Sequence, residues 1–315
     1  MSDVLFVKTS SLGDVIHHMP ALTEARAQQP ATRFAWVVEE AFASLVRLHP
    51  AVDDVIPVAS RRWRRSLLAA STWREIGRFR QGLRARQYDA IVDTQGLLRS
   101  ALIARAARGR RHGYDAGSIR ERAASLFYNV RYSVPRGQHA IARNRALTGL
   151  ALGYSPEGPP DYGLDRATLS APSLHRYAVL LHATAERSKE WPVEEWIALG
   201  QSVCARGTRV LLPWGNARER ERSRAIAAAL PDADVPDLQP LDAVARLIAG
   251  ASLVVGVDTG LLHLAGALNV PLVAIFVGSE PGLTGPMGQG PIAVIGGKGE
   301  LPSASAVIAA VDRTV

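Results

Sequence analysis

The sequence has a single cysteine, and this scarcity excludes two kinds of site. Cys204 alone cannot form a disulfide within the chain, and it cannot supply a cysteine-based zinc site. It lies in an apolar run, so we expect an inert core residue. This thiol usage is typical of a cytosolic protein.

The chain also lacks a long hydrophobic run. No stretch of about 18 apolar residues occurs, so no segment is expected to span a bilayer. The first residues show no basic segment followed by an apolar stretch, so we expect no secretory signal. These absences predict a protein that works in the cytoplasm.

Two phosphate-binding motifs are missing as well. No Gly-x-x-x-x-Gly-Lys-Ser/Thr occurs, and the Gly-Gly-Lys-Gly at 296–299 lacks that spacing. No Gly-x-Gly-x-x-Gly follows the first apolar run, which argues against a dinucleotide dehydrogenase. The pair Asp232 and Asp234 follows a helix and a proline, so we interpret it as a turn. His17 and His18 are expected on different sides of one helix, so no metal site is predicted.

Basic side chains, in contrast, are abundant and concentrated in the first half. The 315 residues carry a formal net charge of +8. An anionic partner fits this charge: nucleic acid, an acidic membrane surface or a phosphorylated substrate. The alternative is a solvated face whose arginines reflect a GC-rich genome, and the charge count leaves both open. Against the single acid Glu75, residues 61–86 hold Arg61, Arg62, Arg64, Arg65, Arg74, Arg78, Arg80, Arg84 and Arg86, and more arginines follow at 99, 105, 108, 110, 111, 120 and 122.

Short apolar runs alternate with helical patterns in the first half. Amphipathic stretches at 14–28 and 73–86 separate the apolar runs, and a helical run at about 140–152 closes this half. Strands that alternate with helices predict βαβ units and a parallel sheet. The predicted strands are 4–7, 34–38, 55–58, 90–93 and, more weakly, 111–114.

The second half repeats this alternation after a segment rich in proline and glycine. We therefore predict an α/β protein with two Rossmann-like domains facing a cleft, at 1–153 and 163–315, joined by a linker at 154–162. The length agrees with two domains of about 150 residues each. The predicted strands are 178–182, 209–213, 253–257, 272–276 and 292–295, and the predicted helices are 193–205, 218–229 and 241–250.

The first apolar run leads into the most informative segment, Val4-Leu-Phe-Val-Lys-Thr-Ser-Ser-Leu-Gly-Asp14. In an open α/β sheet this junction lies at the carboxyl end of the first strand, where such folds bind ligands. An acid there, beside Lys8 and at a helix start, is a candidate general base. The alternative is that Asp14 only caps the helix, which acids do well. The two roles are compatible.

A second concentration of polar residues follows the strand at 253–257. It contains Asp258, Thr259 and Gly260, and His263 lies on the first turn of the next helix. Free backbone N–H groups and the helix dipole at such a junction bind anions. Because a carboxylate repels phosphate, we expect Asp258 to orient the turn or to bind a sugar hydroxyl. The alternative is an ordinary strand-to-helix turn with polar caps.

Two further loops of the second half carry candidate ligands. Thr184 and Lys189 follow a predicted strand, and Lys189 offers a positive charge to a diphosphate. The alternative for a lone loop lysine is a solvated side chain. Trp214 lies in a Pro-Trp-Gly turn and equally fits the core, and Glu219 offers a carboxylate to ribose hydroxyls.

Six motifs occur in order along the chain: the segment ending at Asp14, Arg61-Arg-Trp-Arg-Arg65, Ser125-Leu-Phe-Tyr-Asn129, the loop at 182–189, Pro213-Trp-Gly215 and Val257-Asp-Thr-Gly-Leu-Leu-His263. As a set they resemble the lipopolysaccharide heptosyltransferases of glycosyltransferase family 9. The similarity runs from about Val4 to residue 285. Within the family it is strongest to the enzymes that add the first heptose of the inner core.

The resemblance implies a GT-B fold, in which two Rossmann-like domains face a central cleft. It implies transfer of L-glycero-D-manno-heptose from ADP-heptose onto the Kdo of Kdo2-lipid A, with inversion and with no metal or other cofactor. The acceptor lies in the inner leaflet, so the enzyme is expected as a peripheral protein on the cytoplasmic face of the inner membrane. Nucleic acid is not an expected partner.

The resemblance also implies roles for individual residues. Asp14 matches the general base, and Lys189 is expected to stabilise the charge that develops on the diphosphate. Ala185 departs from the family, which often has a second threonine after Thr184, so one hydroxyl contact to the diphosphate is expected to be missing. Thr184, Lys189, Glu219, Asp258, Thr259, Gly260 and His263 match donor contacts, and Lys8, Ser10, Ser11, Arg61, Arg62, Arg64, Arg65, Arg120 and His139 match positions near the acceptor.

Three alternatives remain at this point. A sibling enzyme would add heptose to an acceptor that already bears heptose, but the arginines at 61–65 favour the first-heptose enzyme, whose acceptor carries Kdo carboxylates near the site of transfer. A nucleic-acid-binding protein would show a helix-turn-helix, a zinc finger or an aromatic stacking motif, and none is found. A nucleotide-sugar sensor without activity would not need Asp14.

Overall fold

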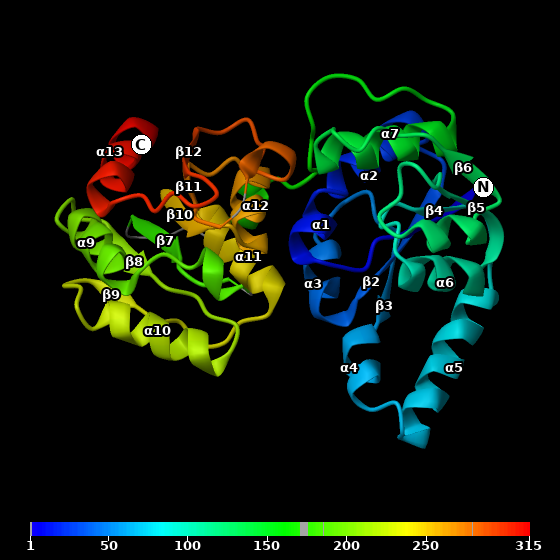
Figure 1. The fold of residues 1–315 in the computed structure, drawn as a ribbon, viewed down its shortest axis with the longest axis horizontal. Helices are drawn as coiled ribbons and strands as arrows, with labels where there is room; N and C mark the ends of the chain where they lie inside the picture. The colour runs from blue at the N-terminus through cyan, green and yellow to red at the C-terminus, as the bar shows by residue number, and fades with distance from the viewer. Residues whose placement is uncertain (1, 171–175, 185, 279) are drawn as a thin grey trace. The chain divides into compact units, whose positions relative to one another are not determined.

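The computed structural model describes residues 2–170, 176–184, 186–278 and 280–315. The chain folds into two compact units, Met1–Gly163 (unit 1) and Leu164–Val315 (unit 2). Each unit has its own six-stranded parallel sheet with helices packed against it (Figure 1).

Unit 1 is built on a sheet whose spatial strand order is β3-β2-β1-β4-β5-β6. β1 pairs with β2 on one side and with β4 on the other, so that Val4 lies opposite Phe34 and Ala90. This is a Rossmann-type order, and ligands of such sheets bind at the carboxyl ends of the strands where the order reverses, here β1 and β4. The strands are β1 (Asp3–Val7), β2 (Arg33–Glu39), β3 (Asp54–Val58), β4 (Gln87–Asp93), β5 (Arg108–Tyr114) and β6 (Val130–Tyr132).

Helices connect these strands and cover both faces of the sheet. Leu5 and Val7 of β1 pack on one face with Leu83. On the other face the Phe6 ring centroid lies 5.0 Å from that of His18. Burial on both faces explains why β1 is apolar throughout. The helices are α1 (Leu12–Ile16), α2 (Met19–Gln28), η1 (Glu40–Phe42), α3 (Ala43–Val46), α4 (Ser60–Arg65), α5 (Ala70–Arg84), α6 (Leu98–Ala106), η2 (Arg122–Phe127) and α7 (Ala140–Leu152).

The prediction of a single helix over residues 14–28 is wrong. The structure has two helices, because α1 ends at Ile16 and α2 begins at Met19 with Pro20 in its first turn. Proline has no N–H to donate to the preceding turn, so a continuous helix would lose a hydrogen bond there. His17 and His18 therefore lie at the break rather than on two sides of one helix, and both are buried.

Helices α4 and α5 form a hairpin that extends away from the sheet of unit 1 (Figure 1, in blue and cyan). The ring centroids of Trp63 and Phe79 lie 5.6 Å apart in an edge-to-face arrangement, which joins the two helices. The Ser66 and Thr72 hydroxyls form a 3.0 Å hydrogen bond across the turn. The hairpin thus has its own small set of internal contacts.

The segment predicted as a linker, 154–162, packs on unit 1. The Tyr154 hydroxyl donates a 3.4 Å hydrogen bond to the Ala21 carbonyl in α2. Arg145 of α7 donates a 2.7 Å hydrogen bond to the Glu157 carbonyl. These contacts hold the segment against α2 and α7.

Unit 2 repeats the same strand order, β12-β11-β10-β7-β8-β9. The strand order reverses between β7 and β10, which pair in parallel with Val254 opposite Val179. The carboxyl ends of these two strands are therefore the expected ligand site of unit 2. The strands are β7 (Tyr177–Leu181), β8 (Arg209–Leu211), β9 (Ala233–Asp234), β10 (Leu253–Val257), β11 (Leu272–Phe276) and β12 (Ile292–Gly296).

The core of unit 2 lies between its sheet and three helices of one face. Trp191 and Trp196 are fully buried, and their ring centroids lie 5.1 Å apart at a near-perpendicular angle. They pack with Val210, Val255 and Val311 in one apolar cluster. The helices of unit 2 are α8 (Arg166–Leu169), η3 (Arg187–Lys189), α9 (Val193–Cys204), α10 (Ala217–Ala227), α11 (Leu241–Gly250), α12 (Gly260–Ala267), η4 (Pro281–Leu283) and α13 (Ala304–Thr314).

The predicted α/β class with two parallel sheets is confirmed. Buried strands were the most exact predictions, since the limits of β10 and β11 agree with the sequence pattern at both ends. Periodicity does not predict α4, α6, β6 or α13. In the part of the chain that the structure describes, no helix has the length and apolar character needed to cross a membrane.

Candidate active site

Asp14 lies in the first turn of α1, directly after the loop that follows β1. Ser11 is the residue that caps this helix, and its backbone N–H donates a 2.9 Å hydrogen bond to Asp14 Oδ2. The Ser11 hydroxyl lies 3.2 Å from the same oxygen. Asp14 therefore takes the carboxylate position of a capping box, three residues after the cap itself. Asp14 thus contributes to the helix cap, as one interpretation of the sequence had it, but the N-cap residue itself is Ser11.

Two cations lie close to this carboxylate. Lys8 Nζ is 3.9 Å from Asp14 Oδ1, and Arg120 Nη1 is 3.8 Å from Asp14 Oδ2. The Lys8 ammonium is buried and also donates hydrogen bonds to the Thr94 carbonyl at 3.0 Å and to Asn144 Oδ1 at 3.4 Å. Burial lowers the pKa of Lys8, and the negative charge of Asp14 opposes this shift. The structure thus brings Lys8, Asp14 and Arg120 together, as the resemblance implied.

The end of β4 contributes a residue that the sequence did not identify. Gln95 Oε1 accepts hydrogen bonds from the Thr9 backbone N–H at 2.6 Å and from the Thr9 hydroxyl at 2.7 Å. Gln95 Nε2 donates to the Ser10 carbonyl at 2.7 Å. Gln95 therefore holds the Asp14 loop by three bonds. Its position after the strand next to β1 is the only sequence signal that could have found it.

Arg99 is a second residue with no role assigned from the sequence. Its Nη2 donates a 2.9 Å hydrogen bond to the Ser10 hydroxyl. Burial lowers the pKa of the Arg99 guanidinium, and the nearby charges of Arg64 and Arg61 lower it further. Arg99 therefore contacts the Asp14 loop and lies within electrostatic range of Arg61 and Arg64.

The four arginines of α4 differ in their contacts. Arg62 forms hydrogen bonds to both Glu40 and Glu75, at distances between 2.7 and 3.1 Å. Arg61 lies over the Phe42 ring at 5.1 Å, and Arg64 and Arg65 are exposed. Among the four, Arg62 is therefore the one whose charge is already neutralised by carboxylates.

His139 lies at the N-terminus of α7. Its Nδ1 accepts a 3.2 Å hydrogen bond from the Ile141 backbone N–H, so His139 caps this helix. Its ring centroid is 5.4 Å from that of His17, whose carbonyl accepts a 3.0 Å bond from Asn144. Because Asn144 also accepts from Lys8, His139 belongs to the surroundings of the Asp14 loop.

In unit 2, two loops meet at the carboxyl ends of β7 and β10. Lys189 Nζ donates a 2.9 Å hydrogen bond to Asp258 Oδ2. The Thr184 hydroxyl donates a 3.0 Å bond to the Asp258 carbonyl. Asp258 thus binds Lys189 through its carboxylate and Thr184 through its backbone carbonyl, whereas the sequence led us to expect that the carboxylate would orient its own turn or bind a sugar hydroxyl. Ala185, the departure from the family pattern, lies outside the described residues.

The start of α12 supplies the backbone groups that the sequence predicted as an anion site. Gly260 is the first helical residue, and Thr259 precedes it in an extended conformation. His263 lies in the first turn of α12, and its Nε2 is 4.0 Å from Oδ1 of Asp258, which precedes the helix. A Cβ atom added at Gly278 would lie only 3.0 Å from the Ser188 carbonyl oxygen. The backbone of the loop after β11 therefore packs closely against the loop that carries Lys189.

Glu219 and Arg218 lie together in the first turn of α10, with different contacts. Glu219 accepts hydrogen bonds from the Gly215 N–H at 2.7 Å and from Asn216 Nδ2 at 2.6 Å, so its carboxylate orders the turn before the helix. Arg218 was not predicted, yet its Nη2 lies 3.5 Å from the Thr184 carbonyl and its Nη1 is 2.7 Å from Glu190. Arg218 is therefore a second cation at the β7 loop.

The side chains that commonly bind metal ions are those of His, Cys, Asp and Glu. Within the described ranges, no three of these side chains come together in a way that could hold a metal ion. Cys204 is half-buried in α9, and its sulfur lies 3.4 Å from the Asp232 carbonyl.

Known proteins are similar to this chain in both sequence and fold. Residues 76–309 match the model of glycosyltransferase family 9 (heptosyltransferase). The chain is 48% identical over 292 residues to lipopolysaccharide heptosyltransferase 1 of Pseudomonas aeruginosa, covering 91% of this chain and 81% of that protein. It is 44% identical over 290 residues to the protein of the same name in Escherichia coli, covering 91% of each.

Solved structures agree with these relatives. A structure described as the E. coli heptosyltransferase WaaC with ADP matches with a TM-score of 0.94 at 42% identity, covering 99% of this chain and 100% of that one. E. coli ADP-heptose heptosyltransferase II matches with a TM-score of 0.80 at 21% identity, which shows the fold alone. The resemblance found in the motifs is confirmed, and the protein is a glycosyltransferase. The chain belongs to glycosyltransferase family 9, the heptosyltransferase family.

Proposed function

We propose that this heptosyltransferase moves L-glycero-D-manno-heptose from ADP-heptose onto the Kdo of Kdo2-lipid A, with inversion and without a metal ion. The ion pair between Lys8 and Asp14, at the carboxyl end of β1, carries the proposal. The relatives named heptosyltransferase 1 support the acceptor, because their identity to this chain extends over 91% of it. The E. coli heptosyltransferase 2 is 34% identical over only 106 residues.

Unit 2 is proposed to bind the donor. Lys189 and the backbone N–H groups at the start of α12 suit a diphosphate, since cations and helix N-termini both favour phosphate. The structures of E. coli WaaC with ADP and with ADP-2-deoxy-2-fluoro heptose support a nucleotide-heptose donor. Asp258 holds Lys189 in place, while Thr184, Thr259 and His263 provide further polar contacts.

Asp14 is proposed as the general base of a single displacement. Its Oδ2 is occupied by Ser11, so Oδ1 is the oxygen that takes the proton from the attacking hydroxyl of the acceptor. The new bond forms to the anomeric carbon as the bond to the diphosphate oxygen breaks, and the electron pair leaves with ADP. Attack from the face opposite ADP inverts the configuration. Positive charge at Lys189 stabilises the departing diphosphate.

The acceptor is proposed to bind on unit 1. Kdo carboxylates and lipid A phosphates are anions that arginine binds through paired hydrogen bonds. Arg61, Arg64 and Arg120 lie near the Asp14 loop or near Arg99, which contacts it. Because this acceptor is a lipid of the inner leaflet, we place the working enzyme on the cytoplasmic face of the inner membrane as a peripheral protein.

One transfer assay tests the proposal. The protein is incubated with ADP-heptose and either Kdo2-lipid A or an acceptor that already bears heptose. Each reaction is run with and without a chelator, and mass spectrometry measures the masses of the products. We expect one added heptose on Kdo2-lipid A in both conditions, and an inverted anomeric configuration by NMR. Transfer only to the heptosylated acceptor would assign the sibling reaction, and loss of activity with chelator would contradict metal-free chemistry.

A further inference from the structure

A groove on unit 1 lies between the α4–α5 hairpin and α6. Its cavity volume is about 850 Å³, which is within the usual size of a small-molecule pocket. Its apolar lining comes from all three helices and from the turns beside them. The main apolar residues are Trp63, Leu67, Ile76, Phe79, Leu98 and Leu102.

Several of these side chains are unusually exposed for leucines. Leu67, Leu98 and Leu102 are 48%, 40% and 50% exposed. At the turn of the hairpin, Leu68 and Trp73 are exposed as well. Exposed apolar patches of this kind are typical of binding surfaces, because burying apolar side chains against a partner removes them from water and is favourable.

Arginines surround the apolar lining. Arg64, Arg80, Arg84, Arg99 and Arg105 all line the groove, and Glu121 is the one acid among its lining residues. The Glu121 carboxylate accepts a 2.6 Å hydrogen bond from the Leu98 backbone N–H, so it caps α6. The groove therefore combines an apolar surface with a strong positive charge.

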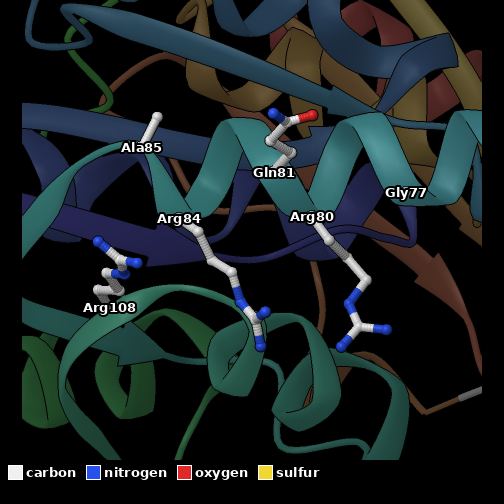
Figure 2. A pocket seen from close by; sticks show the side chains of 6 residues that line it. All are labelled: Gly77, Arg80, Gln81, Arg84, Ala85 and Arg108. Atoms are coloured by element: carbon white, nitrogen blue, oxygen red, sulfur yellow. The ribbon is translucent and has the colours of Figure 1, made fainter.

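A second hollow next to the groove extends this charge. Arg80 and Arg84 line both hollows, and Arg108 joins them in the second one. Figure 2 shows the Arg80 and Arg84 side chains extending from the same side of α5, while Gln81 points away. Among the described residues that line this hollow there is no acid, which suits an anionic headgroup.

The groove is connected to the candidate active site by Arg99. Arg99 lines the groove and donates a 2.9 Å hydrogen bond to the Ser10 hydroxyl. The next residue, Ser11, binds Asp14. A ligand in the groove would therefore extend from the base to the outer arginines Arg80 and Arg84.

We propose that this groove binds an acyl chain of the acceptor glycolipid, with the lipid's phosphates on the surrounding arginines. The inference rests on the proposed function and names the part of the acceptor that unit 1 recognises beyond the sugars. An apolar lining beside clustered arginines matches one occupant, an anionic amphiphile. Neither a free sugar phosphate nor a purely apolar ligand uses both features.

Two acceptors and two matched variants test this site. The acceptors are Kdo2-lipid A in mixed micelles and the same molecule after alkaline removal of its acyl chains. The variants are Leu102→Gln in the groove and Leu150→Gln on α7, because Leu150 is 49% exposed on the same unit. We expect Leu102→Gln to raise the KM for the acylated acceptor about tenfold, and to leave the KM for the deacylated acceptor and for ADP-heptose unchanged. Leu150→Gln should change none of these.

The outcomes separate this inference from the proposed function. If the wild-type protein transfers no heptose to either acceptor, the proposed function fails. If it transfers heptose but Leu102→Gln changes the KM of both acceptors equally, or of neither, the acyl-chain site is wrong. Photolabelling with an acceptor that carries a diazirine on one acyl chain gives an independent readout. Labels on α5 and α6 support the groove, whereas labels confined to the hairpin turn at Leu67, Leu68 and Trp73 would mean bilayer contact instead.

Discussion

Lys8 and Asp14 form an ion pair in which the cation is buried and the carboxylate is accessible. The ammonium is 3.9 Å from Asp14 Oδ1, and the two side chains are 6% and 26% exposed. A substrate hydroxyl can therefore reach the carboxylate while the buried Lys8 side chain lies behind it.

Asp14→Asn should abolish turnover while donor affinity stays close to wild type. Asparagine retains an oxygen that can accept the Ser11 N–H, so α1 keeps its start, but an amide cannot take a proton. Loss of a general base costs roughly 10² to 10⁴ in rate. Steady-state kinetics give kcat, and calorimetry with ADP gives the donor-side affinity. Near-normal turnover would remove Asp14 from the mechanism.

Lys189→Met should weaken ADP binding by about tenfold or more, because a charge-assisted hydrogen bond to phosphate is lost. Lys298→Met is the matched control, since it removes the same charge from an exposed turn of the same unit. Calorimetry measures both dissociation constants. Equal values for the two variants would show that Lys189 acts only through net charge.

The arginines of α4 should not be equivalent. Arg61→Gln and Arg64→Gln are each expected to raise the acceptor KM about tenfold, and neutralising all four should raise it far more than the donor KM. Arg62→Gln should have the smaller effect, because Glu40 and Glu75 already bind this guanidinium. Kinetics with each substrate varied in turn separate the two KM values. Equal changes in donor and acceptor KM would argue against an acceptor site on α4.

Acid should destabilise unit 1 through His49. Burial lowers the pKa of His49 to about 4, whereas an unfolded histidine titrates near 6.5. Below pH 6.5 the unfolded chain therefore binds a proton that the folded chain does not. The free energy of unfolding should fall as the pH drops from 6.5 to 4, by up to about 1.4 kcal/mol per pH unit for this group.

The variant His49→Gln isolates that contribution. The loss of buried contacts lowers its Tm at every pH, so the quantity to compare is the drop in Tm between pH 7 and pH 5. We expect a smaller drop in the variant than in the wild type. The same drop in both proteins would assign the acid sensitivity to other groups, such as His182 of unit 2, whose pKa burial lowers to about 3.

Much of the fold could be predicted because its strands are buried on both faces. Every residue of β10 is buried, so apolar character alone marks both of its ends. The end of α1 was missed because apolar residues continue past it, although Pro20 is a sequence signal for the start of a new helix. Short elements such as β6, with three residues, are too brief for a period to appear.

The sequence pattern by itself predicted the candidate site only where its residues lie close together along the chain, and the family resemblance supplied distant residues such as Arg120. Ser11 and Asp14 are three positions apart, and Asp258 to His263 span little more than one helical turn. Gln95 and Thr9, in contrast, are 86 positions apart and meet only because β4 pairs with β1. A charge count likewise could not show that Arg62 is paired, because its partners come from two other elements.

The hydrogen bond between Lys189 and Asp258 has a consequence for the end of each catalytic cycle. A diphosphate that binds Lys189 shares the three N–H donors of the ammonium with a carboxylate that never leaves the protein. Because Asp258 already neutralises part of the Lys189 charge, the ammonium attracts ADP less strongly than an unpaired lysine would. In the proposed reaction, the same pair that orients Lys189 for the donor would thus also limit how tightly ADP is held after transfer.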